Sequence, residues 1–403
     1  MHHAKVLAFI GIIAVALVIA GCTQPAEPQT GNATVSFLYT SVGQMPQLLA
    51  TGQVDGYMVW QPFVAVAEVG KFGTVVSYSQ DLPPPGLWED HSCDSLVARN
   101  AVVAANPGLT DALSVVLIEA TTYAKENPDR TAEICADWIF GGGDLTFGNV
   151  TVSSVDVEKA SIPTIRFTNE PSPQWKESNT VFIDALKDIG YVTGSLANVS
   201  PDESDALLYD FGPYENAMAI IQNGTVPTPE GEAKKITLGY LLSDHDAPLF
   251  VAIKEWKYFE DKYGIALKPV SDAPGKVENA ELIVNGKKVA DVQLVKGEGG
   301  AQLMTLLASN TIDFAEAGTP PTISAIDKGT PIKILFPLHT EGSGLVVTSK
   351  AQVTGWDSFV SWIKDQGAKG ETVTIAVAPK GSIQDVQLKY ALEQSGVAVI
   401  EAK

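Results

Sequence analysis

Residues 44–62 (QMPQLLATGQVDGYMVWQP) and residues 302–320 (QLMTLLASNTIDFAEAGTP) repeat one pattern. Each stretch reads as a short amphipathic helix, a tight turn, an acidic residue, a strand and a loop with a proline. The shared residues are Gln44, Leu48, Leu49, Ala50, Asp55 and Pro62, which fall on Gln302, Leu306, Leu307, Ala308, Asp313 and Pro320. Such an αβ unit ends at the carboxyl edge of a sheet, where open α/β sheets bind ligands. Two copies predict two similar lobes that face each other across a cleft.

The composition is that of a folded protein with an acidic surface. At 403 residues, the chain is long enough for more than one domain and a sizeable core. A hydrophobic fraction of 45% and a charged fraction of 18% indicate a globular chain rather than a disordered one. The formal net charge of −20 argues against nucleic-acid binding, which needs a basic face. Acidity of this kind is typical of a soluble extracellular surface.

The N-terminus carries a targeting signal. Lys5 precedes an apolar run at residues 6–20, which is short for a membrane span but fits a secretory signal peptide. Residues 19–22 (IAGC) resemble a lipobox, so residues 1–22 are expected to be a lipoprotein signal peptide in which Cys22 becomes the lipid-modified first residue. The alternative is an uncleaved anchor helix. Residues 23–33 form a polar tether, and both interpretations place the folded part outside the cytoplasmic membrane.

The order of the segments along the chain is unusual. Strand and helix patterns after the tether lead into a helical tract, which ends at a linker at residues 223–234 (NGTVPTPEGEAK). A second α/β series starts at Lys235. A strand–helix unit that begins at Thr372 has no later strand to pair with, and a strand at residues 35–39 opens a sheet without a preceding one. Each half of the chain therefore supplies what the other lacks.

Several stretches carry a family resemblance. In the second half they are ITLGYL, APLFVA, VKGEGGAQLMTLLASNTIDFAEAGTPP, GSGLVVTS and VTIAVAPKGSIQDVQLKYALEQSGV. In the first half they are LLATGQVDGYMVWQPF, SLVARNAVVAANPGLTDAL and LLYDFGPYENAM. Residues 235–403 resemble the amino-terminal half of an ABC-transporter solute-binding protein of the nitrate, taurine, sulfonate and thiamine-precursor class (NMT1/SsuA-like), and residues 34–222 resemble the carboxyl-terminal half. The halves stand in reverse order, which implies a circular permutant; the alternative is two truncated halves that each need a partner chain.

The resemblance implies an α/β fold of the periplasmic-binding-protein-like type II kind, with two α/β lobes and a hinge. The smaller lobe is expected to combine residues 34–88 with 350–403, and the larger to hold residues 89–349, with the linker at 223–234 joining the usual termini. The implied function is that of a monomeric, lipid-anchored, extracytoplasmic receptor. It would capture a small molecule between the lobes and deliver it to ABC permease and ATPase subunits, without a cofactor.

Ligand contacts are expected in loops at the carboxyl ends of strands, where helix N-termini present free N–H groups. The expected ligand-binding residues are Asp244, His245, Asp246, Gly299, Gly300, Gly318, Thr319, His339, Thr340 and Ser343 in the larger lobe, and Gly381, Ser382, Ser41, Gln44, Trp60 and Gln61 in the smaller one. Two alternatives stay open at this point. Gly381 and Ser382 could cradle an anion, or Ser382 could be an ordinary N-cap, and Asp246 could likewise be the N-cap of the helix that follows it.

The expected loops are acidic. They contain or adjoin Asp244, Asp246, Glu298, Glu316 and Glu341, whereas only Lys296 and Lys380 oppose them. A sulfonate or nitrate site usually needs arginine or several basic donors, and no arginine occurs in these loops. The composition of the loops therefore favours a neutral heterocycle, an amine or a zwitterion over a simple anion.

Metal binding and catalysis are not expected. His91, Cys93, His245 and His339, with Glu341, are metal-ligand types, but their spacing matches no recognised motif and they lie in separate loops. Cys93 and Cys135 could form a disulfide in an exported protein, or Cys135 could be a core residue. The alternative function is an enzyme on the same fold, related to thiamine-pyrimidine synthesis. Those enzymes carry a cysteine-rich iron-binding run that this chain lacks, so a receptor is favoured.

Overall fold

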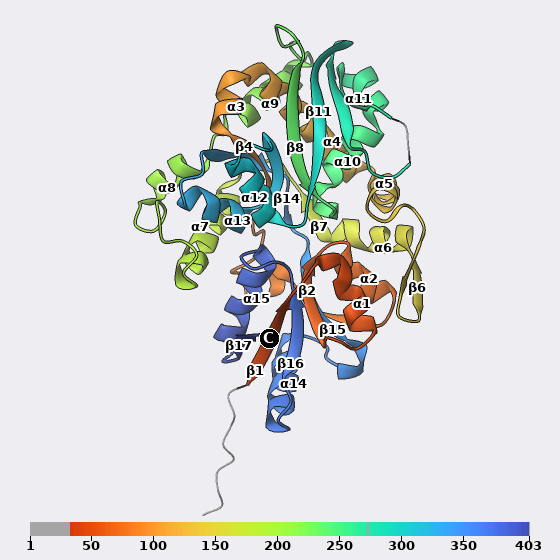
Figure 1. Ribbon diagram of the computed structural model, residues 1–403, viewed down its shortest axis with the longest axis vertical. Helices are drawn as coiled ribbons and strands as arrows, with labels where there is room; N and C mark the ends of the chain where they lie inside the picture. The colour runs from red at the N-terminus through yellow and green to blue at the C-terminus, as the bar shows by residue number, and fades with distance from the viewer. Residues whose placement is uncertain (1–32, 272–273, 403) are drawn as a thin grey trace, which may run out of the picture. The chain divides into compact units, whose positions relative to one another are not determined.

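The computed structural model describes residues 33–271 and 274–402. The predicted signal peptide, including Cys22, and all but the last residue of the predicted tether lie outside the described residues. The chain is mixed α/β, and two large sheets organise it (Figure 1). Each sheet combines strands from the early and the late part of the chain.

The first large sheet has six strands. Their order is β17 (Ala398–Glu401), β1 (Thr34–Tyr39), β16 (Val373–Val377), β2 (Gly56–Trp60), β15 (Ser343–Thr348) and β3 (Gly73–Tyr78). All strands run parallel except β15, which is antiparallel to both of its neighbours. The first and last described strands of the chain, β1 and β17, therefore lie side by side in one sheet (Figure 1).

The second large sheet has seven strands. Their order is β13 (Ile332–Pro337), β4 (Asp94–Arg99), β12 (Phe314–Gly318), β8 (Lys234–Leu241), β11 (Lys287–Gly297), β10 (Asn279–Val284) and β9 (Ile265–Pro269). A hairpin connects β10 and β11, and its Asn285 and Gly286 adopt the left-handed conformation with φ of 51° and 74°. Two small sheets complete the set: β14 (His339–Glu341) with β7 (Ile165–Phe167), and β5 (Asp144–Phe147) with β6 (Val150–Ser153).

Helices cover both large sheets. Those that contact the six-stranded sheet are α1 (Met45–Ala50), α2 (Phe63–Val69), α14 (Trp356–Ala368) and α15 (Ile383–Gln394). In Figure 1, α15 lies on one side of this sheet and α1 and α2 on the other, as right-handed crossovers between parallel strands require. The remaining helices are α3 (Asn100–Ala105), α4 (Pro107–Glu126), α5 (Pro128–Phe140), α6 (Ser154–Ser161), α7 (Pro173–Asp188), α8 (Pro201–Leu208), α9 (Gly212–Asn223), α10 (Ala247–Lys254), α11 (Trp256–Tyr263), α12 (Gly300–Ala308) and α13 (Thr319–Asp327). Within the described ranges, no helix combines the length and apolarity that a membrane span requires.

The internal repeat is confirmed as a structural repeat. Its first copy forms α1 and β2, and its second forms α12 and β12. In each sheet the repeated strand lies between a parallel strand (β16 or β8) and an antiparallel one (β15 or β4). The two copies thus hold equivalent places in two related sheets.

Each large sheet contains an antiparallel strand, β15 or β4, that the chain enters directly after crossing over from the other large sheet. The chain leaves β3 of the six-stranded sheet and enters β4 of the seven-stranded one; it later leaves β13 and returns through β14 into β15. The two crossovers touch where Ser92 pairs with Thr340. Since β15 pairs within the six-stranded sheet, the chain changes sheets before Ser343, whereas the predicted division between the lobes falls at residues 349 and 350.

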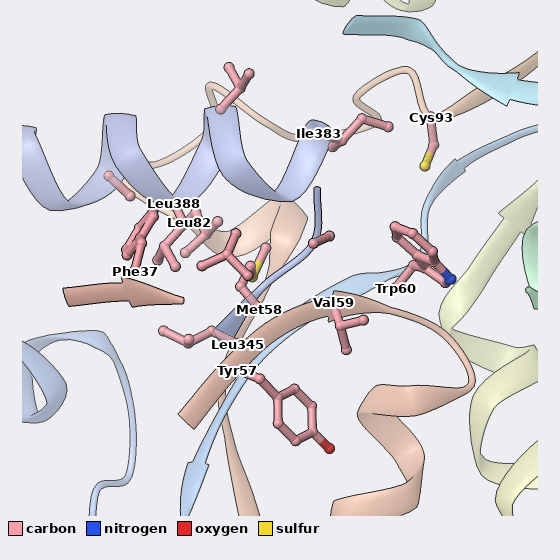
Figure 2. Packing of buried hydrophobic residues seen from close by; sticks show 14 of the residues in the cluster. Phe37, Tyr57, Met58, Val59, Trp60, Leu82, Cys93, Leu345, Ile383 and Leu388 are labelled. Carbon is pink, nitrogen blue, oxygen red and sulfur yellow. The ribbon is translucent and has the colours of Figure 1, made fainter. Parts of the chain in front are cut away.

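The core is apolar and well filled around both sheets. Figure 2 shows the part around Met58 and Leu345, in which Phe37, Leu82 and Leu388 pack together. The same cluster reaches Trp60, Cys93 and Ile383 at its end, where the site described below begins. Around the seven-stranded sheet, Trp138 stacks on Phe250 with ring centroids 4.6 Å apart. Burial of such aromatic surface stabilises this part of the fold.

Candidate functional site

A small cavity lies where loops from the two large sheets meet. Its volume is about 20 Å³, which is room for a single water molecule. The residues that line it are Trp60, Asp94, Leu241, His245, Gly300, Gly318, Pro321, Ser382, Ile383 and Gln384. Trp60, Leu241 and Gly318 stand at the last positions of β2, β8 and β12, which is the edge where α/β sheets bind ligands.

A larger groove adjoins the cavity. It has a volume of about 520 Å³, and Pro321 lines both spaces. Ala301 and Gly381 of the groove are sequence neighbours of Gly300 and Ser382 of the cavity. The groove therefore lies next to the cavity, along α12 and α13.

The predicted site residues fall into four groups. Those that line the cavity are Trp60, His245, Gly300, Gly318 and Ser382. Those buried outside its lining are Gln61, Asp244, Asp246, Gly299, Thr319, His339, Thr340 and Ser343. Gly381 lines the outer groove, while Ser41 and Gln44 are exposed and line neither space. The lining residues that sequence reasoning missed are Asp94, Leu241, Pro321, Ile383 and Gln384.

The loop after β2 is tied to the opposite sheet by hydrogen bonds. The backbone carbonyl of Gln61 accepts from Ser243 Oγ at 3.1 Å and from the Asp244 N–H at 3.3 Å. Its own N–H donates to the Gly342 carbonyl at 3.0 Å. Its buried side chain bridges Thr164 and Ala65, which fixes the position of Trp60 beside it.

The helix start at Gly381 and Ser382 is already capped from within the chain. Ser382 Oγ accepts from the Asp385 N–H at 3.3 Å, and the Asp385 carboxylate accepts from the Gly381 N–H at 2.8 Å. Tyr39 donates to the same carboxylate at 2.7 Å, and Lys389 pairs with it at 2.8 Å. The N-cap alternative is therefore correct, because a carboxylate of the protein takes the place that an external anion would need.

Three buried carboxyl groups lie beside the cavity. Asp94, Asp246 and Glu316 are at most 3% exposed, and the carboxyl groups of Asp246 and Glu316 lie within hydrogen-bond reach of each other, so that one can donate when it is protonated. Burial raises the pKa of Asp94 to about 7 and that of Glu316 to about 8. Burial, with the nearby charges of Glu316 and Asp94, holds the pKa of Asp246 well above its usual range. Asp246 stands at the N-cap position of α10 but makes no side-chain cap there, so the capping alternative does not explain it.

Two histidines and a cysteine converge next to these acids. Cys93 Sγ lies 3.6 Å from Nδ1 of His245, and the rings of His245 and His339 are 4.1 Å apart between centroids. Ligand atoms of Cys93, Asp94, His245 and His339 all lie within 4.8 Å of one another, although no metal site was expected. Cys135, Glu158 and Asp244 form a second group of side chains whose potential metal-ligand atoms lie within 4.8 Å of one another. Both cysteines are free thiols, so they form no disulfide with each other.

His91 and Glu341, the other two residues with metal-ligand side chains that the sequence analysis named, lie outside this cluster. The His91 ring contacts the Ser92 carbonyl at 3.0 Å and Ser79 Oγ at 2.8 Å. Glu341 accepts a hydrogen bond from the Asp90 N–H at 3.2 Å. Both therefore support the crossovers, whereas Asp94, which the sequence did not suggest, takes their place in the cluster.

Comparison with known proteins places the chain in a family. The NMT1-like family matches residues 17–139 and 229–402, which is well over half of the chain. An uncharacterized protein of Methanocaldococcus jannaschii is 45% identical over 119 residues, covering 29% of this chain and 79% of that protein. The family supports a solute-binding or related function. The predicted resemblance is therefore confirmed, and this chain belongs to the NMT1-like family.

Proposed function

We propose that this protein is an extracytoplasmic, lipid-anchored receptor that captures a small molecule between its two sheets and delivers it to an ABC importer. The observation that carries the proposal is the lining of one cavity from both sheets. Trp60 belongs to the six-stranded sheet, and Asp94 and Gly318 belong to the seven-stranded sheet. A site divided in this way opens when the sheets part and closes around a ligand when they approach, with the two crossovers as the hinge. Permease and ATPase subunits are the partners of such a monomeric receptor.

The proposed ligand is a cation or a neutral molecule rather than an anion. Asp94 and His245 line the cavity, whereas none of the lysines and arginines that the structure describes does so. Lys328 and Lys380 line only the outer groove. An anion in the cavity would face buried carboxyl groups without a balancing charge, which is costly at low dielectric. An amine, a zwitterion or a neutral heterocycle meets no such penalty.

The anchoring and the permuted order are part of the same proposal. The lipid anchor rests on the sequence around Cys22. The permutation is supported by strand order. The places of β1, β16, β2, β15 and β3 in the six-stranded sheet correspond to those of β11, β8, β12, β4 and β13 in the seven-stranded sheet. The seven-stranded sheet is built in the order β8, β11, β12 and β13, and the six-stranded sheet would follow the same order if β16 came before β1. Joining the C-terminus to the start of β1 would therefore restore a continuous lobe.

Ligand binding tests the proposed function directly. Amines, pyrimidines, flavins, nitrate and sulfonates are screened by thermal shift, and each hit is followed by isothermal titration and by tryptophan fluorescence. A true ligand should raise the melting temperature and change the fluorescence of the wild-type protein but not of Trp60→Phe, with Trp362→Phe as the control. Turnover of the ligand would point to an enzyme instead. A screen without any stabilising compound would contradict the receptor.

A further inference from the structure

The four-residue cluster beside the cavity has the geometry of a metal site. Cys93 Sγ lies 3.6 Å from His245 Nδ1 and 3.9 Å from Asp94 Oδ1. In a tetrahedral zinc site with metal–sulfur distances of about 2.3 Å and metal–nitrogen or metal–oxygen distances of about 2.1 Å, neighbouring ligand atoms are roughly 3.3–3.6 Å apart. These two distances are within a few tenths of an ångström of that spacing, and all four ligand atoms lie within 4.8 Å of one another, so no pair has to close by more than about 1.5 Å to surround an ion.

Hydrogen bonds on the far side of each histidine turn a lone pair toward the cluster. His245 Nε2 lies 2.9 Å from the Gly342 carbonyl, and His339 Nδ1 lies 3.4 Å from the Thr340 carbonyl. Because a carbonyl only accepts, each of these nitrogens carries the proton. His245 Nδ1 and His339 Nε2 are left with lone pairs, and the latter meets only a long 3.4 Å contact from the Asp94 N–H. A carbonyl behind a histidine is the usual second shell of a metal-bound imidazole.

The charge balance of the cluster also points to a cation. Asp94 is 3% exposed, and its Oδ2 has no hydrogen-bond partner. None of the ion pairs between described residues involves Asp94, Asp246 or Glu316. A divalent ion would neutralise one thiolate and one carboxylate together.

We propose a binding site for a divalent transition-metal ion such as Zn²⁺ beside the cavity, formed by four side chains: Cys93, Asp94, His245 and His339. One sulfur, two imidazoles and one carboxylate form a ligand set that suits zinc. Cys93 and His339 come from opposite crossovers, so the ion fastens the two crossovers to each other and to the loop after β8. The proposal does not depend on the receptor function, because it rests on the geometry of this cluster alone.

Cobalt(II) is the spectroscopic probe for the test. His2, His3 and Cys22 are replaced by alanine in every sample, since each could bind the probe outside the cluster. The otherwise wild-type chain, freed of metal by a chelator, should take up one equivalent of Co²⁺. It should show the intense visible bands of a tetrahedral site with a thiolate charge-transfer band in the near ultraviolet, and Zn²⁺ should displace the probe.

Two variants and one matched control locate the site. Cys93→Ser should lose the charge-transfer band and bind Co²⁺ at least about tenfold more weakly. Asp94→Asn keeps the size of the side chain and should weaken binding similarly, and circular dichroism confirms that both variants fold. Cys135→Ser, the matched control, should behave like the parent chain. Absence of binding at micromolar Co²⁺ and Zn²⁺, absence of the charge-transfer band in the parent chain, or loss of that band in Cys135→Ser rather than Cys93→Ser would overturn the proposal.

Discussion

Asp55 and Asp313 make the same hydrogen bonds in the two sheets. The Asp55 carboxylate accepts from the Thr374 N–H at 2.8 Å, and the Asp313 carboxylate accepts from the Thr237 N–H at 2.9 Å. Each aspartate also donates its own N–H to the carbonyl of the same threonine, at 2.9 Å and 3.0 Å. The aspartate that precedes each repeated strand therefore sets the register of that strand relative to its parallel neighbour.

Replacing either aspartate by alanine should destabilise the protein, with Asp313→Ala the costlier change. Each substitution leaves a backbone N–H without its acceptor, which costs about 1–3 kcal/mol. Asp313 also pairs with Arg99 at 2.5 Å, and both side chains are less than one-fifth exposed. Urea unfolding measures the difference, with Asp261→Ala on the exposed face of α11 as a control expected to change stability by less than about 0.5 kcal/mol. Equal effects for all three variants would contradict the assigned role.

Stability should depend on pH through Glu158. This residue is fully buried, and burial together with the charge of Asp244 holds its pKa well above the usual range. Above the unfolded pKa of about 4.3, the unfolded chain has released a proton that the folded state keeps, so the free energy of unfolding falls by up to about 1.4 kcal/mol for each unit of rising pH. Glu158→Gln should remove this slope. Urea unfolding from acid to mildly alkaline pH should show the free energy of unfolding of the variant increasing relative to that of the wild type as pH rises. A constant difference between the two proteins would contradict this role of Glu158.

The proposed permutation predicts that a re-cut chain folds. A chain that begins at Lys235 and ends near Gly224, with Lys403 joined to Thr34 by a flexible linker of about a dozen residues, should be a folded monomer. The linker has to run back along the sheet because β17 and β1 are parallel neighbours, in which the Ala402 N–H donates to the Phe37 carbonyl at 2.8 Å. Circular dichroism, thermal melting and analytical ultracentrifugation compare it with the native order. Aggregation of the re-cut chain alongside a dimeric native protein would favour two exchanged halves.

The proposed lipid anchor depends on one side chain. In cells that process lipoproteins, the wild-type chain should partition into the detergent phase of a phase-separation assay, whereas Cys22→Ala should not. Cys93→Ser, which alters a buried thiol of the folded part, should partition like the wild type. Recovery of the wild-type chain in the aqueous phase would contradict anchoring.

The local units were predictable from the sequence, and the meeting of distant residues was not. The strand predicted after the acidic residue in residues 44–62 is β2, because a short apolar run after an acidic turn has few alternatives. Ser382 was recognised as a possible N-cap from its place before a helical pattern, and it is one. Cys93 and His245 are 152 positions apart, and only the exchange of β4 between the sheets brings them together. No periodicity in the sequence reports such a contact.

The exchange of strands also sets an order of events during synthesis. The first strands to leave the ribosome, β1 to β3, belong to a sheet whose remaining strands come from residues 343–401. Until residues 343–401 have been made, β1 lacks both β16 and β17, and β2 and β3 lack β15. Their edges stay open for pairing with other chains throughout translation. This lobe can therefore be finished only after residues 343–401 have been made, a schedule compatible with passage through a membrane in the unfolded form.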